Sequence, residues 1–339
     1  MTAVAERRPG YRGTWTNVLR SPVFRLVVKR LLLAIPITLG VSILSFWVVS
    51  LIPGNAAQQL LGPEATPQQI RTMEVQLGLN KPAHERYLDW LGHAVRGDLG
   101  RSPVSGQAVA PQLIDRLAVS GELLGLALIG ALALAVPVAL GAARRPGGLF
   151  DRVSIFVSMI GLSVANYVLA LVLVLVFSVQ LAMLPAIGFV PLSESIGGNL
   201  KSLILPAIAI GFPVFSIYAR FLRGDLVDQM QGQDYVVTAQ AKGVDPWRVL
   251  MRHALRNSSY GLIAVVGLNL GVLIGVTVII EQIFALPGLG QLLLQAVNTR
   301  DIVVIQACVV VFAVVTVVGN LAADLLQTVL DPRIRYGDR

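Results

Sequence analysis

The sequence predicts an all-α polytopic membrane protein whose helices cross the bilayer six times. Of its 339 residues, 55% are hydrophobic and 14% are charged, whereas soluble domains carry about 25% charged residues. Long runs without Lys, Arg, Asp or Glu alternate with short basic segments. The basic residues that give the chain its net charge of +8 therefore lie between apolar runs. These residues do not form a basic face with aromatic partners of the kind that binds nucleic acid.

Six apolar runs are long enough to be spans, because a hydrocarbon core of about 30 Å needs about 20 helical residues. We expect the spans over Leu31–Ile52, Leu123–Ala143, Val153–Phe177, Leu203–Ala219, Tyr260–Ile280 and Ile302–Leu326. The fourth run is short and contains Pro206 and Pro213, which a span tolerates where its neighbours satisfy the freed backbone groups. The first run exceeds the about 7 to 15 apolar residues of a cleavable signal peptide, so we expect it to remain.

Basic residues gather on one side of the predicted membrane. Nineteen of the 27 Lys and Arg residues lie in the arm 1–30, in the loops after the second and fourth spans and in the tail 329–339. Eight lie in the alternating segments, and the six in the loop 53–116 are matched by six acids. Because cytoplasmic segments retain Lys and Arg, we expect both termini in the cytoplasm and the loop 53–116 to be exported.

The exported loop is predicted to contain two short helices. The segment Thr66–Gln69 has a capping-box pattern with proline at the first helical position, and Gly78 would end that helix. A second helix is expected over Glu85–Arg96. One face of this helix would carry Tyr87, Leu91 and Val95. The pair is either a structural cap over the ends of the spans or a docking surface for a partner.

The cytoplasmic loop 220–257 is long for a connection between spans, and its pattern is helical. A helix over Asp234–Lys242 would end at Gly243, and Asp245 followed by Pro246 would begin another. The result is a helix, a tight turn and a second helix outside the membrane. This element either meets a partner or rests on lipid headgroups as an interfacial helix.

The segment DYVVTAQAKGVDPWRVLMRHALRN, Asp234–Asn257, resembles the cytoplasmic motif of the dipeptide/oligopeptide permeases of ABC importers. Five other segments also resemble signatures of that family and occur in the same order along the chain: PGNA, LGLNKPAHERYLDWL, GDLGRS, EQIFALPGLGQLLLQAV and DPRIR. The resemblance covers Val28–Arg335. The chain departs from the family pattern at Val237 and Gln240, where arginine is usual, and at Asn55, where aspartate is usual.

This resemblance implies a type I ABC importer permease fold over 117–328, with the span 31–52 and the loop 53–116 as family-specific additions. It implies that the cytoplasmic motif seats in a groove on an ATPase. The coupling residues would be Asp234, Tyr235, Ala239, Ala241, Lys242, Gly243, Arg248 and His253.

The partners implied are a second homologous permease, two cytoplasmic ATPase domains and an extracytoplasmic substrate-binding protein in a bacterial inner membrane. The cargo would be di- or oligopeptides or a related small solute, such as a nickel complex or a glutathione-like compound.

Several other functions find no support in the sequence. No G-x-x-x-x-G-K-[ST] motif occurs, so another chain must hydrolyse ATP, and we expect neither catalytic residues nor a cofactor. The single Cys308 and the three histidines lack the spacing of a metal site. A secondary transporter or channel that is not coupled to ATP is the alternative. Buried charge pairs or broken helices at midplane would favour it.

Polar residues within the spans are few. Glu122, Glu281 and Asp324 fall near span ends, where we expect water or headgroups to solvate them. Three deeper amides either face a translocation path or bond neighbouring helices: Asn166, Asn269 and Asn320. No residue is assigned to substrate contact.

Overall fold

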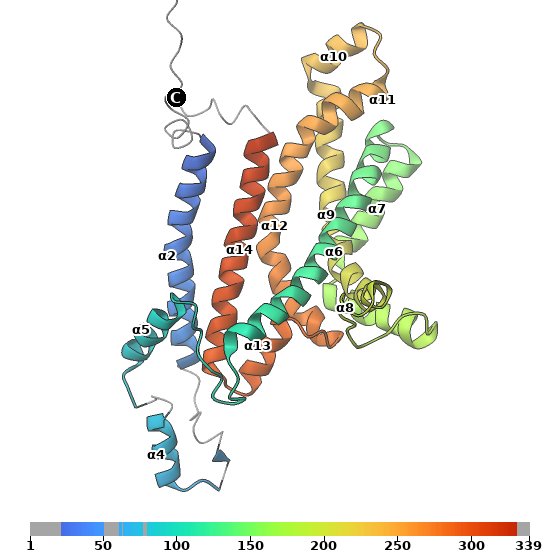
Figure 1. Ribbon diagram of the computed structural model, residues 1–339. Coiled ribbons are helices and arrows are strands. Elements are labelled where there is room, and N and C mark those ends of the chain that lie inside the picture. Colours follow the sequence, from blue (N-terminus) through green and yellow to red (C-terminus); the bar gives the residue numbers. More distant parts are fainter. Residues whose placement is uncertain (1–21, 51–60, 63, 77–79, 331–339) are drawn as a thin grey trace, which may run out of the picture.

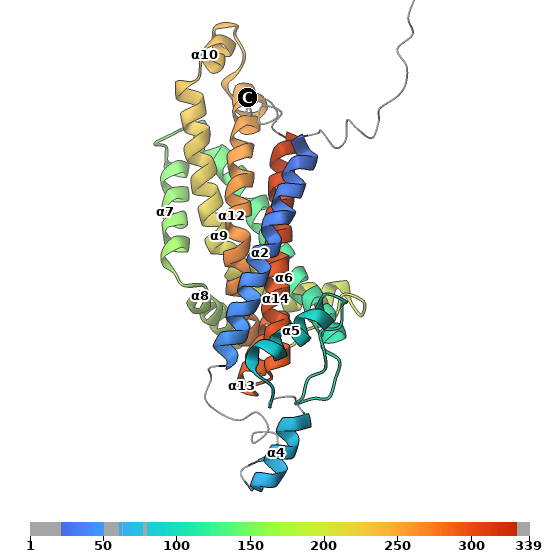
Figure 2. The same ribbon diagram turned by 90° about the vertical axis from the view of Figure 1, so that its left-hand side faces the viewer.

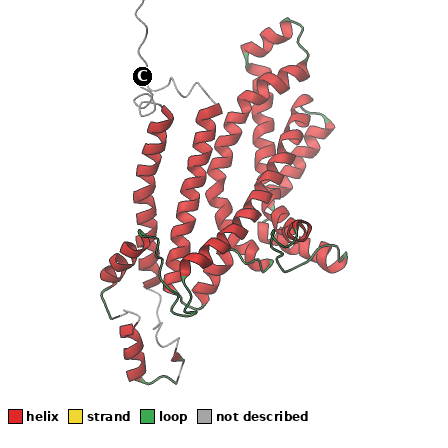
Figure 3. Ribbon diagram, viewed as in Figure 1, coloured by secondary structure: helices red, strands yellow, loops and turns green. Residues whose placement is uncertain are grey.

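The computed structural model describes residues 22–50, 61–62, 64–76 and 80–330. Over this part of the chain the regular elements are helices, without strands (Figure 3), so the all-α prediction is confirmed. Four features lie outside the described residues: the arm before Pro22, the PGNA motif, Gly78 and the DPRIR motif.

In the described part, five helices are long and apolar enough to cross a membrane, or six spans if one bent pair counts as a span. They are α2 (Pro22–Ser50), α6 (Val109–Arg144), α9 (Ile196–Gly232), α12 (Leu255–Ile283) and α14 (Ile302–Leu330). Helix α2 packs on α14, α14 on α12, and α9 on both α12 and α6 (Figures 1 and 2).

The third predicted span is bent, which the sequence did not indicate. Instead of one helix over Val153–Phe177, α7 (Leu149–Ser163) meets α8 (Asn166–Leu173) at an angle of 102°. The chain is extended at the two residues between them, with ψ of 125° at Val164 and 138° at Ala165. The π-helix η1 (Val174–Gln180) then continues α8.

Helix α9 is much longer than its predicted span and passes through Pro206 and Pro213 without ending. In its most apolar window, 72% of the residues are buried inside the protein. Pro206 is buried and Pro213 half-buried against neighbouring helices, and packing of this kind is the condition under which a span tolerates proline. At Gly211, an added Cβ would lie 3.0 Å from the backbone oxygen of Ala127, so the glycine lets α6 approach closely.

The two ends of the bundle differ. One end carries the short helices α10 (Asp234–Ala241) and α11 (Pro246–Val249), and we call it the α10 end (Figure 1). At the opposite end, the α4 end, lie α4 (Pro67–Gln76), α5 (Ala83–Ala94) and α13 (Leu289–Asn298) (Figures 1 and 2).

Both predicted helices of the loop 53–116 form. The capping box is confirmed, because the Thr66 N–H donates to Gln69 Oε1 (2.8 Å) and the Gln69 N–H to Thr66 Oγ1 (3.4 Å). Helix α5 packs on α2 through Tyr87, whose hydroxyl lies 3.3 Å from Ser42 Oγ. Val95 does not share this face, since α5 ends at Ala94 and Val95 is 82% exposed.

Candidate functional site

The segment 220–257 is a helical hairpin at the α10 end (Figure 1). Helix α9 runs unbroken to Gly232, α10 follows, and the chain returns as one helix of 38 residues over Pro246–Ile283. The predicted helix, turn and second helix are therefore confirmed. The second helix does not stop outside the apolar region, however, because it continues through η2 (Leu250–Ala254) into α12.

The turn after α10 is built on Gly243. Its φ of +76° lies in the left-handed region, which glycine adopts without the strain that a Cβ brings. The Val244 N–H reaches the Ala239 oxygen (3.1 Å), and the Lys242 N–H reaches the Thr238 oxygen (3.2 Å). The hydrogen bond from Val244 back to Ala239 spans five residues, and a bond of this span defines a Schellman C-cap.

The returning helix has a strong N-terminal cap. Asp245 Oδ2 accepts hydrogen bonds from the N–H groups of Trp247 (3.0 Å) and Arg248 (3.2 Å). Pro246 occupies the first helical position, where no N–H is required. Such a cap contributes about 1 kcal/mol to helix stability. The sequence Gly243 to Pro246 thus fixes the direction in which the chain reverses.

Buried side chains hold α10 against the rest of the hairpin. Val236, Val249 and Ala254 are at most 1% exposed. The Tyr235 hydroxyl donates to Gln229 Oε1 on α9 (2.7 Å), and its ring lies 6.4 Å from the ring of His253. A movement of α10 would therefore move α9 and the start of α12 with it.

A further contact joins this hairpin to α6. The Arg144 guanidinium carbon, in the last turn of α6, lies 5.5 Å from the ring centroid of Trp247. This distance is within the range of a cation–π interaction. Three spans or their extensions, α6, α9 and α12, thus meet at the α10 end.

The predicted coupling residues are mostly on the surface of this hairpin. Tyr235 and Ala239 are half-buried on α10. The exposed members are Asp234, Ala241, Lys242, Gly243, Arg248 and His253. The structure brings Tyr235 and His253 together, while Lys242 and Gly243 form the turn and Arg248 lies on α11.

An ion pair beside the hairpin was missed by sequence reasoning. Arg223 on α9 donates to Asp151 on α7 through Nε to Oδ1 (2.8 Å) and through Nη2 to Oδ2 (2.7 Å). The Gly147 N–H also donates to Asp151 Oδ2 (2.7 Å). Because the partners are separated by 72 residues, only the folded arrangement of α7 and α9 reveals the pair.

A second polar network lies at the α4 end, and it corrects the expectation for Glu281. We expected water around this carboxylate, but the residue is 0% exposed. It accepts from Ser120 Oγ (2.6 Å) and from the N–H groups of Gly290 (2.7 Å) and Gln291 (3.0 Å). Helix α13 thus presents its first N–H groups to a buried carboxylate, which satisfies both partners.

Three further polar residues that the sequence singled out have defined partners. Glu122 accepts from Asn199 Nδ2 (3.0 Å), and Asp324 forms a 2.7 Å ion pair with Arg30 of α2. Asn269 donates to the Val265 oxygen one turn earlier in its own helix (2.8 Å), so its amide nitrogen has a partner within α12.

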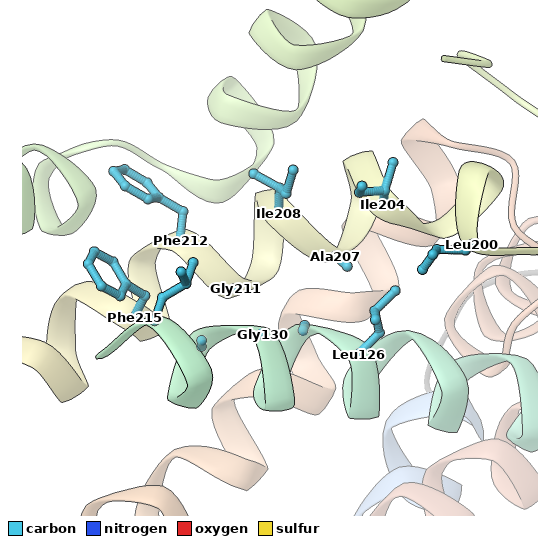
Figure 4. A pocket seen from close by; sticks show the side chains of 12 residues that line it. Leu126, Gly130, Leu200, Ile204, Ala207, Ile208, Gly211, Phe212 and Phe215 are labelled. Atoms are coloured by element: carbon cyan, nitrogen blue, oxygen red, sulfur yellow. The ribbon is translucent and has the colours of Figure 1, made fainter. Parts of the chain in front are cut away.

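An apolar cavity of about 320 Å³ opens between α6 and α9. Figure 4 shows Leu126 and Gly130 of α6 facing Ala207 and Gly211 of α9, with Phe215 toward one end. Its twelve lining residues are all apolar or glycine. The cavity suits a hydrocarbon surface rather than a charged ligand. Nor do three His, Cys, Asp or Glu residues converge as a metal site in the described part of the chain.

Two family profiles match the chain. Residues 23–121 match the N-terminal segment of the binding-protein-dependent transport system membrane component, and residues 135–336 match the inner membrane component of such systems. The boundary between them falls within α6.

Curated relatives extend over nearly the whole chain. A putative peptide transport system permease protein of Brucella abortus is 38% identical over 311 residues, covering 92% of this chain and 99% of that protein. The oligopeptide transport system permease protein AppB of Bacillus subtilis is 37% identical, covering 91% and 99%. The glutathione transport system permease protein GsiC of Salmonella choleraesuis is 36% identical, covering 91% and 98%.

The match of the larger profile to residues 135–336 and the identity of 36 to 38% over nine-tenths of the chain agree with the helical architecture. The chain belongs to the family of inner-membrane components of binding-protein-dependent transport systems, and it is a multi-pass permease subunit of an ABC importer.

Proposed function

We propose that this chain and a homologous permease form the translocation path of a bacterial importer, and that two cytoplasmic ATPase domains dock at the α10 end. The observation that carries the proposal is the capped hairpin between α9 and α12, whose short helix α10 projects beyond the spans (Figure 1). Buried contacts and a cap at each end of the turn hold this helix in a fixed position beyond the spans.

In this proposal α10 is the element that seats against the ATPase. Ala239 and Ala241 are small, so a partner groove could approach the helix backbone. Lys242 and Arg248 supply exposed positive charge around it. The partner's movement would pass to the spans through Tyr235 and Gln229, and through Trp247 and Arg144.

The orientation proposed places the α10 end and both termini in the cytoplasm, with α4 and α5 outside. The charge distribution supports it, since nineteen of 27 Lys and Arg residues fall on that side. The division proposed is a basic arm 1–30, a first span 31–52, an extracytoplasmic loop 53–116, a transmembrane body 117–328 and a tail 329–339. An extracytoplasmic binding protein would deliver cargo to the α4 end.

We propose peptides or a related small solute as cargo. The supporting observation is that the relatives are named as peptide, oligopeptide and glutathione permeases. Nothing in the described cavity selects among these, because its lining carries no charge.

A secondary transporter is the competing reading, and two features favour it: the bend at Val164 and Ala165 and the buried Asp151 carboxylate. Reconstitution separates the two readings. Proteoliposomes containing the full complex should take up a labelled oligopeptide only with ATP and the binding protein, and an imposed proton gradient should drive no uptake. Gradient-driven uptake without ATP would overturn the proposal.

A further inference from the structure

The ion pair between Asp151 and Arg223 joins α7 to α9 near the α10 end of the bundle. Both guanidinium contacts are between 2.7 and 2.8 Å, and the Asp151 side chain is 2% exposed against 25% for Arg223. A two-point contact of this kind fixes the relative orientation of the two groups as well as their distance. The pair therefore sets how α7 meets α9.

Burial limits the contribution of this ion pair to the stability of the fold. Charges removed from water lose hydration that their mutual attraction only partly returns, and apolar replacements are often as stable. The effect that the structure shows is instead the geometry that the pair imposes on α7 and α9. On the α7 side, the ion pair involves Asp151 in the first turn, whose carboxylate also accepts from the N–H of Gly147 just before the helix.

The same two helices are locked at a second point. Gly161 of α7 lies so close to Ser216 of α9 that an added Cβ would overlap the serine hydroxyl oxygen. The contacts at 151 with 223 and at 161 with 216 thus bracket one stretch of each helix. Together, the ion pair and this close approach limit the rotation of α7 against α9.

Arg223 also lies on the part of α9 that leads to α10. Between Arg223 and Gly232 the helix is unbroken, which corresponds to about 14 Å along its axis at 1.5 Å per residue. Helix α10 begins at Asp234. At its other end, α7 reaches the 102° bend and α8, and α8 packs on both α9 and α12.

We infer that Asp151 and Arg223 are a positioning pair that transmits movement of α10 to α7 and the bent α8. This inference rests on the proposed function of α10 as the ATPase-docking helix. The pair touches neither cargo nor nucleotide. Its role is to make the bent third span move together with the end of α9 that leads to α10.

The test measures coupling in the assembled complex. Asp151→Asn and Arg223→Gln should assemble and retain basal ATP hydrolysis. Stimulation of hydrolysis by the loaded binding protein, and cargo taken up per ATP, should fall at least about fivefold, the lower end of coupling between sites. Arg223→Lys, which keeps the charge but loses the two-point contact, should recover only part. The matched control is Arg152→Gln, an exposed neighbour of Asp151, which should change neither quantity.

Stimulation and uptake per ATP within twofold of the unmodified complex in both variants would overturn the inference. An equal loss in Arg152→Gln would do the same. If Asp151→Asn fails to assemble, Arg223→Lys decides: reduced stimulation in an assembled complex supports the pair, whereas normal stimulation or failed assembly contradicts it. The proposed function fails separately, if a cysteine at Val237 on α10 does not reach the ATPase.

Discussion

Replacing Gly243 tests the turn that carries α10, because its strain can be separated from any steric clash. An added Cβ would meet no atom within 4 Å, so the cost arises from the backbone alone, at φ +76°. Side chains in the left-handed region cost about 1–2 kcal/mol. Asparagine tolerates this conformation better than alanine, and a β-branched residue tolerates it least. We expect the damage to rise in the order Gly243→Asn, Gly243→Ala, Gly243→Val.

The expected size follows from the bonds that depend on this conformation, from Val244 to Ala239 and from Lys242 to Thr238. A loss of about 1–2 kcal/mol shifts an opening equilibrium by a factor of about 5 to 30. Amide hydrogen exchange of these two N–H groups should accelerate by that factor if the turn opens locally. Substrate-stimulated ATP hydrolysis in the full complex should decline in the same order.

Gly232→Ala is the matched control, since Gly232 also lies in open space but has no positive φ. It should leave both exchange and hydrolysis unchanged. Wild-type exchange in Gly243→Val would refute the reasoning, and so would equal damage from the asparagine and valine variants.

Three further predictions address docking, topology and the α4 end. Ala239→Trp should obstruct docking by volume, so that the chain reaches the membrane at normal levels while stimulated ATP hydrolysis is lost; retained hydrolysis would show that this face is not used. A cysteine at Ala83 should react with an impermeant thiol reagent in sealed cells, whereas one at Gln233 should react only after lysis, and the reverse pattern would invert the topology. Ser120→Ala removes one donor from the buried Glu281 carboxylate, a loss of about 1–3 kcal/mol. It should lower the unfolding temperature of the purified chain in detergent, and an unchanged temperature would contradict the role of this network.

The spans were predictable because a bilayer demands long uncharged runs, but their ends were not. The fourth span was expected to stop at Ala219, before Arg220, yet α9 continues to Gly232. Charged residues mark where the hydrocarbon ends, whereas a helix can continue into water with its backbone bonds intact. The predicted span was also short and contained two prolines, and 72% of the most apolar window of α9 is buried inside the protein.

The bend in the third span had little local signal beyond Gly161 and Ser163, which lie just before it. Breaks in helices are usually found at proline or glycine, but Val164 and Ala165 stand at this one. Both α7 and α8 pack on α9, so the bend depends on contacts between segments far apart in the sequence. Periodicity within Val153–Phe177 could not report it.

The candidate site was likewise predictable only where its structure follows from local sequence. The reversal at Gly243, Asp245 and Pro246 follows from local rules for ending and starting helices, and it was predicted. The partners of Asp151 and Glu281 come from elsewhere in the fold. Glu281 in particular looked solvated, because only the return of the chain into α13 brings backbone donors to it.

Cross-linking from α10 tests most directly whether this end of the permease meets the ATPase. Val237 on α10 is 62% exposed, Val95 at the α4 end is 82% exposed, and the native Cys308 is buried, so single added cysteines can be compared on a silent background. In the purified complex, a thiol-reactive cross-linker at Val237→Cys should capture the ATPase, and one at Val95→Cys should not. Capture from Val95→Cys, or none from Val237→Cys in a complex that still transports, would contradict the account.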